Sequence, residues 1–104
     1  MTDDATVFTV SGELDLSSSV ELEEALSQLD GSETGLVILD LRNVDFMDSA
    51  GLAVVVKAHA QAESAGRAFG VVQGSPQVRR LLSLTRVDAM MTVTQTPEEL
   101  LGGG

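Results

Sequence analysis

Hydrophobic positions along the chain follow two patterns, one typical of strands and one typical of helices. Four short apolar runs have the composition of strands, and they lie at residues 7–10, 36–39, 69–72 and 90–93. The run at 36–39 is apolar without interruption, which is typical of a strand buried on both faces of a parallel sheet. The sequence therefore predicts a sheet of four short strands.

Apolar residues at helical spacing follow these runs. The helices predicted from that spacing begin near Ser18, Ser49, Ser75 and Thr96. The second helix contains three consecutive valines at 54–56, which favour a strand, but its length and its alanines decide for a helix. The resulting β-α-β-α-β-α-β-α order predicts an α/β fold: a single domain with a small, mostly parallel sheet and about four helices.

Residues that cap helices support these boundaries. A Ser or Thr followed three positions later by Glu forms a capping box, Ser before Pro is a favoured helix start, and Gly favours a helix end. The expected caps are Ser18 with Glu21, Ser75 with Pro76 and Thr96 with Glu99 at helix starts, and Asp30-Gly31-Ser32 and Gly66 at helix ends.

Length and composition limit the class of protein. The chain of 104 residues suffices for one hydrophobic core, so we expect a single domain at 1–101 and a flexible glycine tail at 102–104. The absence of Cys from the sequence excludes disulfides and thiolate metal sites. We find neither a signal peptide nor an apolar stretch of the roughly 20 residues that a membrane span needs, and therefore expect a cytoplasmic protein.

The charge of the chain indicates which partners it can have. The sequence has 16 acidic and 6 basic side chains, for a formal net charge of −10. Such a surface repels nucleic-acid backbones and anionic lipid head groups, so neither nucleic acid nor a membrane is expected as a partner. A basic or mixed-charge protein is the partner that this charge favours.

Two acidic segments follow the first two predicted strands. They are Gly12-Glu13-Leu14-Asp15 and Asp45-Phe46-Met47-Asp48-Ser49-Ala50-Gly51. The carboxyl ends of parallel strands meet at one end of a sheet, where ligands and chemistry gather. We therefore expect the four carboxylates of these segments to lie near the hydroxyl of Ser49.

The sequence does not supply the combination of catalytic residues that an enzyme of a known class would need around Ser49. The three aspartates Asp40, Asp45 and Asp48 suggest a Mg²⁺ site or a phospho-aspartate receiver. A receiver needs a Lys at a late strand end, and Lys57, the only Lys, falls inside the second predicted helix. A serine hydrolase needs a base within reach of the serine. His59, the only His, lies ten residues beyond Ser49 in the same predicted helix and is therefore about 15 Å away along the helix axis. No catalysis and no cofactor are expected.

Four segments together carry a resemblance to a known family. They are Gly12-Glu13-Leu14-Asp15, Val37-Ile38-Leu39-Asp40-Leu41, Phe46-Met47-Asp48-Ser49-Ala50-Gly51-Leu52 and Ser75-Pro76-Gln77-Val78-Arg79-Arg80-Leu81-Leu82. With these segments the chain resembles the anti-sigma factor antagonists of the STAS (sulfate transporter and anti-sigma antagonist) domain family. The Met-Asp-Ser-x-Gly-Leu pattern in this context is the most specific part of the resemblance.

The resemblance implies a binding protein that phosphorylation controls. Its unphosphorylated form would bind an anti-sigma factor serine kinase and so free a sigma factor, and the kinase would phosphorylate Ser49. A metal-dependent serine phosphatase would reverse the modification, and ATP would belong to the kinase. The partner contacts expected from the resemblance are Glu13, Asp15, Asp48, Ser49, Ala50 and Gly51.

Some alternatives stay open at this point. Ser49 is a phosphorylation site, a helix cap or both, and Asp15 and Asp48 are partner contacts or caps. The family often has Ser or Thr where this chain has Ala50. An accessory STAS-type subunit of a transporter or signalling scaffold is the alternative function.

The family also usually has a strand before the first one predicted here. Without it, residues 7–10 would form an open sheet edge, which invites pairing with another chain. The chain is accordingly expected to be a monomer or a weak dimer.

Overall fold

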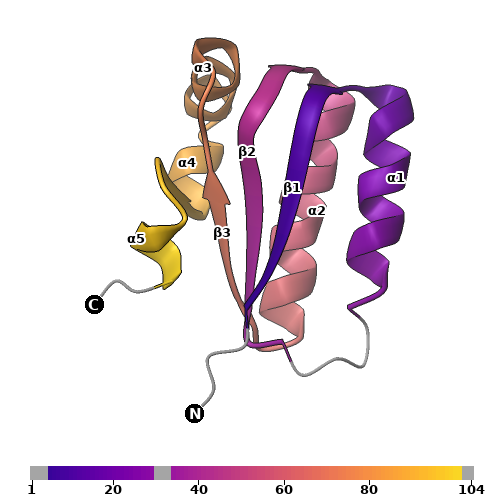
Figure 1. Ribbon diagram of the computed structural model, residues 1–104, viewed down its shortest axis with the longest axis vertical. Coiled ribbons are helices and arrows are strands. Elements are labelled where there is room, and N and C mark those ends of the chain that lie inside the picture. Colours follow the sequence, from indigo (N-terminus) through magenta and orange to yellow (C-terminus); the bar gives the residue numbers. More distant parts are fainter. Residues whose placement is uncertain (1–4, 30–33, 102–104) are drawn as a thin grey trace.

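The computed structural model describes residues 5–29 and 34–101. Within these ranges it contains four strands and five helices (Figure 1). The strands are β1 (Ala5–Leu14), β2 (Leu36–Met47), β3 (Ala68–Val72) and β4 (Thr92–Thr94), and the helices are α1 (Leu16–Ser27), α2 (Ser49–Ser64), α3 (Pro76–Leu84), α4 (Val87–Met90) and α5 (Glu98–Leu101). The predicted alternation of strands and helices in an α/β fold is confirmed.

The strands form one sheet in the order β1-β2-β3-β4, and every neighbouring pair is parallel. Figure 1 shows β1 and β2 ending at the same end of the molecule, where α1 and α2 begin. The two acidic segments of the sequence lie at that end. In the sheet that the described residues form, β1 is an edge strand, and Val7 is 44% exposed.

β1 and β2 extend several residues beyond the predicted runs at 7–10 and 36–39. The register between them shifts twice in the second half of β1. Each shift moves the following side chains to the other face of the sheet, so an alternation of period two cannot be followed through the sequence. The acidic segments, expected to follow these strands, therefore lie partly within them, because β1 continues to Leu14 and β2 to Met47.

The last strand is preceded by a helix that the sequence pattern did not predict. α3 ends near Thr85, Arg86 adopts a left-handed conformation with φ of 63°, and α4 follows at once. Met90 belongs to α4 and is 53% exposed, so the prediction of a buried strand beginning at Met90 is wrong. A helix of one turn is too short to show helical periodicity in the sequence.

Two of the predicted helix ends are confirmed, at Ser75 and at Gly66. The Ser75 hydroxyl accepts a hydrogen bond from the Val78 amide at 3.2 Å, with Pro76 at the first helical position. Gly66 follows α2 with φ of 75°, and the Arg67 amide donates to the Ala62 carbonyl at 2.8 Å, as in a Schellman motif.

Other predicted caps differ or lie outside the described residues. Thr96 and Glu99 interact through their side chains, because the Thr96 hydroxyl donates to the Glu99 carboxylate at 3.1 Å. The predicted helix end at Asp30-Gly31-Ser32 and the glycine tail at 102–104 lie outside the residues that the structure describes.

The hydrophobic core lies mainly between the sheet and helices α1 to α4. Leu39 of β2, Val55 of α2, Val71 of β3 and Leu82 of α3 are all fully buried in it. The opposite face of the sheet is covered in part by α5, whose Leu100 occupies the space that a side chain at Gly70 would need. No helix in the described parts of the chain combines the length and the apolar character that crossing a bilayer requires.

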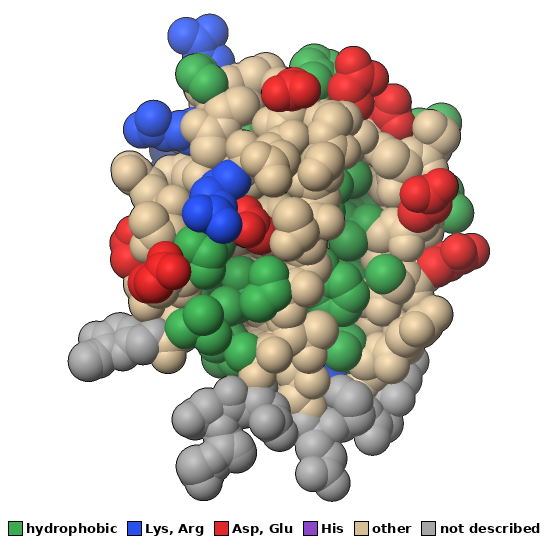
Figure 2. Space-filling model, viewed as in Figure 1, with side chains coloured by type: hydrophobic (Ala, Val, Ile, Leu, Met, Phe, Trp, Pro, Cys, Tyr) green, Lys and Arg blue, Asp and Glu red, His purple; other side chains and the backbone are tan. Residues whose placement is uncertain are grey.

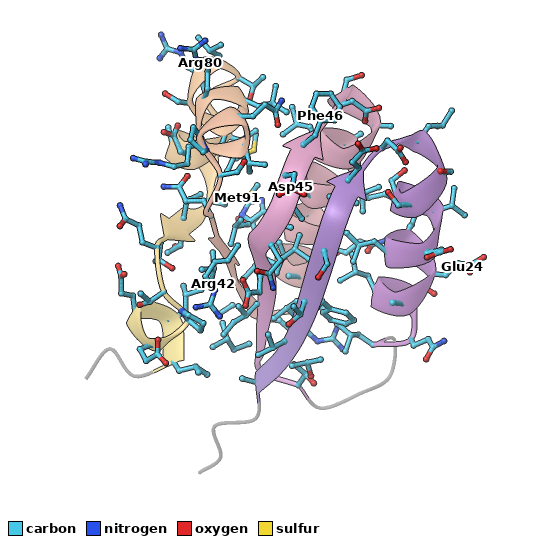
Figure 3. All side chains as sticks on the ribbon, turned by 45° about the horizontal axis from the view of Figure 1, so that its top comes forward. Glu24, Arg42, Asp45, Phe46, Arg80 and Met91 are labelled. Atoms are coloured by element: carbon cyan, nitrogen blue, oxygen red, sulfur yellow. The ribbon has the colours of Figure 1, made fainter. Side chains whose placement is uncertain are left out.

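An ion pair on β2 joins the buried carboxylate of Asp40 to the exposed side chain of Arg42. Asp40 is 4% exposed, and the Arg42 guanidinium donates to both of its carboxylate oxygens, at 3.0 and 2.9 Å. The Arg42 amide donates to the same carboxylate at 3.1 Å. These hydrogen bonds favour the charged form and hold the pKa of Asp40 below its usual value. Figure 3 shows Arg42 on β2, below the strand's carboxyl end.

Replacing Asp40 by Asn is expected to lower the free energy of unfolding by about 1–3 kcal/mol at neutral pH, because Arg42 loses a charged partner. A folded-state pKa below the unfolded value near 3.9 means that the carboxylate stabilises the fold above about pH 4 and that this contribution is lost as pH falls further. Urea unfolding should therefore show a wild-type advantage that shrinks in acid. Asp45→Asn, at an exposed position of β2, is the control. An advantage independent of pH would contradict the prediction.

Candidate functional site

Asp15 joins β1 to α1 as the N-cap of the helix. Its carboxylate accepts hydrogen bonds from the backbone amides of Ser17 and Ser18, at 3.2 and 3.1 Å. The Ser18 hydroxyl accepts from the Asp15 amide at 2.9 Å, so these two residues form the capping box. The predicted capping box between Ser18 and Glu21 is therefore wrong, because the N-cap lies three residues earlier, at Asp15. The bonds from Ser18 and Ser17 lower the pKa of Asp15.

Asp48 has the same role at the start of α2. Its carboxylate accepts from the Ala50 and Gly51 amides, at 2.9 and 3.1 Å. The suggestion that Ser49 is the cap is therefore wrong, because Asp48 is the N-cap and Ser49 is the first residue of the helix. Ser49 is exposed, and no hydrogen bond reaches its hydroxyl from any residue that the structure describes. No described part of the fold therefore depends on a hydrogen bond to this hydroxyl.

Gly51 allows the first turn of α2 to touch the end of β1. A Cβ atom at Gly51 would lie 2.4 Å from the Leu14 carbonyl oxygen and 2.8 Å from Leu14 Cγ. The Asp48 amide donates to the same Leu14 carbonyl at 3.3 Å. Backbone contacts therefore bring the two acidic segments together. Gly51 itself is buried, and its visible role is packing.

The other expected contacts lie on the surface around this junction. Glu13 is exposed and pairs in register with Phe46 of β2, and Ala50 is half-buried. Figure 3 shows Asp45 and Phe46 at the carboxyl end of β2, beside the start of α2. Glu13, Asp15, Asp48, Ser49 and Ala50 thus surround one end of the sheet, whereas Asp40 lies lower on β2 in its ion pair with Arg42.

Two exposed apolar side chains at this end were missed by the sequence reasoning. Leu16 is 72% exposed and Phe46 is 44% exposed. Each stands directly after an aspartate, in a segment that the sequence pattern places outside the core. A large apolar residue next to an aspartate in such a segment is the sequence signal that could have identified Leu16 and Phe46. Figure 2 shows acidic side chains gathered over this end of the molecule and along α1, and basic ones over α3.

Gln77 of α3 is a further residue that the sequence reasoning did not single out. The Met47 amide donates to Gln77 Oε1 at 2.9 Å, and Gln77 Nε2 donates to the Met47 carbonyl at 3.0 Å. The side chain thereby bonds both polar groups of the residue that precedes the Asp48 cap. No sequence signal predicts a contact between residues this far apart in the chain.

The structure does not assemble the alternative sites. His59 packs edge-on against the ring of Phe69, with ring centroids 5.8 Å apart, and Lys57 pairs with Glu23. Within the described ranges, no three acidic or His side chains converge as they would around a metal ion. Around Ser49 the described residues offer an exposed hydroxyl and a surface for contact.

Comparisons with known proteins agree with this geometry. The model of the STAS domain family matches residues 1–100. The chain is 30% identical over 99 residues to the anti-sigma-F factor antagonist RsfB of Mycobacterium tuberculosis, covering 93% of this chain and 79% of that protein. It is 30% identical over 89 residues to the anti-sigma-B factor antagonist of Staphylococcus aureus, covering 86% and 82%. The crystal structure of an anti-sigma factor antagonist from Mycobacterium paratuberculosis matches with a TM-score of 0.87 at 28% identity, covering 99% and 87%.

Proposed function

Because the chain belongs to the STAS domain family, we propose that it is an anti-sigma factor antagonist switched by phosphorylation of Ser49. In this proposal the unphosphorylated protein binds an anti-sigma factor serine kinase in the cytoplasm and releases the sigma factor. Phosphorylation of Ser49 ends the binding, and a serine phosphatase restores it. The chain itself catalyses nothing. The similarity to two named antagonists over most of the chain supports the general role.

One observation carries the choice of Ser49. Its hydroxyl is exposed at the first position of α2, and Asp48 makes the capping bonds that a serine there would otherwise make. A kinase can therefore modify the hydroxyl without removing a bond on which the fold depends. The modification also adds about −1.5 to −2 charges beside a helix N-terminus, which favours negative charge.

The same charge acts differently on a bound partner. In the proposed interface, Asp15 and Asp48 lie close to the phosphate, and the partner must exclude water from all three groups. Each like-charge pair at about 6 Å costs about 0.7–3 kcal/mol for dielectric constants between 80 and 20. Because about 1.4 kcal/mol changes affinity tenfold, a phosphate can release the partner while the domain stays folded.

The surface around Ser49 also indicates the chemistry of the partner. Exposed Leu16 and Phe46 provide apolar contact area, and exposed Glu13 and Asp45 lie beside Phe46. Such a surface fits a partner with an apolar recess whose Lys or Arg side chains face Glu13 and Asp45 and not Ser49, in keeping with the net charge of −10. We assign Glu13, Asp15, Asp48, Ser49, Ala50 and Gly51 to this contact region, with Gly51 acting through the packing beneath it.

The proposal is tested by affinity capture from a lysate of the cell that encodes the protein. The baits are the wild type, Ser49→Ala and Ser49→Asp, with mass-spectrometric identification of the captured proteins. We expect an ATP-binding serine kinase with the wild type and with Ser49→Ala, and at least about a tenfold smaller amount with Ser49→Asp. Ser64→Asp, at the far end of α2, is the matched control and should capture as the wild type does.

Equal capture of the same proteins by all four baits would show that Ser49 does not control binding. Recovery of membrane transporter components in place of a soluble kinase would favour an accessory subunit and would also contradict the proposal.

A further inference from the structure

The far end of β2 lacks a strand neighbour on one side. β3 pairs with β2 only from Leu36 to Asp40, whereas β1 accompanies β2 as far as Met47. In a parallel ladder the amide and carbonyl of one residue point to the same neighbouring strand. At Met47 both groups point to the side where β3 has already ended, and the side chain of Gln77 takes the place of that strand.

The Gln side chain is suited to this position by its chemistry. A primary amide offers one acceptor oxygen and one donor nitrogen side by side, as a peptide group does. Its two bonds to Met47, at 2.9 and 3.0 Å, require the oxygen to face the amide and the nitrogen to face the carbonyl. A carboxylate could accept the first bond but would face the Met47 carbonyl with a second negative oxygen.

Gln77 is itself firmly held. It lies in the first turn of α3, directly after Pro76 and next to Val78, which is fully buried. Leu82, one turn further along α3, is fully buried as well. The side chain of Gln77 is half-buried, so its bonds to Met47 are only partly open to competition from water.

Met47 in turn determines where α2 begins. Its own side chain is 1% exposed, and its Cγ lies 3.0 Å from the position of a Cβ at Gly51. The next residue is the Asp48 cap and the one after it is Ser49. The geometry points to Gln77 as a positioning residue, which holds the junction between β2 and α2 so that the Ser49 hydroxyl is presented to the kinase. This inference rests on the proposed function of Ser49.

The first test uses the isolated chain and amide hydrogen exchange. In Gln77→Glu at neutral pH, we expect the amides of Met47, Ala50 and Gly51 to lose protection by about tenfold or more, because the pair with Met47 is broken. The amide of Val71 in β3 should keep its protection. In acid the protonated Glu regains an O–H donor, so the variant should approach the wild type measured at the same pH.

Gln61→Glu, at an exposed position of α2, makes the same charge change away from the junction and is the matched control. Unchanged protection at Met47 in Gln77→Glu would overturn the inference. Equal loss of protection at Val71 would do the same, because the substitution would then act on the whole fold.

The second test measures phosphorylation of Ser49 by the kinase that the wild-type chain captures. We expect kcat/KM for Gln77→Glu to fall about tenfold at neutral pH and Gln61→Glu to match the wild type. Wild-type phosphorylation of Gln77→Glu would overturn the inference while leaving the proposed switch intact. If the wild type captures no kinase, the proposed function fails, and amide exchange alone decides whether Gln77 holds the junction.

Discussion

Replacement of Gly51 by Ala is expected to lower the free energy of unfolding by about 2–3 kcal/mol, since the new methyl group collides with fixed backbone. The added Cβ would lie 2.4 Å from the Leu14 carbonyl oxygen, and Leu14 is fully buried at the end of β1. Relief of this contact requires the first turn of α2 to move away from β1. Because Ser49 lies in that turn, we also expect weaker binding of the proposed kinase partner.

Urea unfolding and titration with the captured kinase measure the two effects of Gly51→Ala. Gly66→Ala is the matched control, because a Cβ there meets nothing within 4 Å and only the left-handed φ of 75° opposes it. That substitution should cost about 1–2 kcal/mol and leave kinase affinity unchanged. A Gly51→Ala protein as stable as the wild type would mean that the junction is less rigid than the structure shows.

Phosphorylation of Ser49 is expected to lower the affinity for the kinase about tenfold to a hundredfold without destabilising the domain. The helix N-terminus favours the added charge by about 0.3–1 kcal/mol, so the modified chain should unfold at the same temperature or slightly higher. The loss of affinity follows from like charges of Asp15, Asp48 and the phosphate in an interface from which water is excluded.

Thermal unfolding and calorimetric titration of the phosphorylated chain check the two parts of this prediction. Ser64→Asp places a negative charge at the opposite end of the same helix, where the dipole opposes it. It should therefore lower stability by about 0.3–1 kcal/mol and leave kinase affinity unchanged. A phosphorylated domain that unfolds more readily would indicate that loss of structure, rather than charge at the interface, releases the partner.

The sequence predicted the fold class because the buried residues of most strands and helices recur at regular spacing along the chain. The apolar run at 36–39 forms the first part of β2, with Ile38 and Leu39 fully buried, and the Ala-rich second helix is confirmed despite its three valines. Ser75 and Gly66 were also placed correctly, because capping depends on residues within one turn of each other. Where the β1–β2 register shifts and where α4 makes a single turn, no period exists, and these predictions failed.

The sequence identified residues that the structure places at one end of the sheet, but it did not identify their structural roles. The acidic segments and Ser49 were identified together, and the structure brings them to one end of the sheet. The backbone geometry showed that Asp48 is the helix cap and that Ser49 is the exposed first residue of the helix. Asp15 likewise proved to be the cap, with Ser18 as its partner in the box.

The sequence by itself determined the alternating α/β order, the acidic surface and the candidate serine, because periodicity, composition and short motifs are properties of neighbouring residues. Only the tertiary structure decided how the serine is held. The contact of Gly51 with Leu14 and the amide pair of Gln77 with Met47 join segments that are distant in the chain, and such contacts exist only after the sheet has formed. Steric fit and paired hydrogen bonds across elements leave no pattern in the sequence, which is why these residues were recognised only in the folded protein.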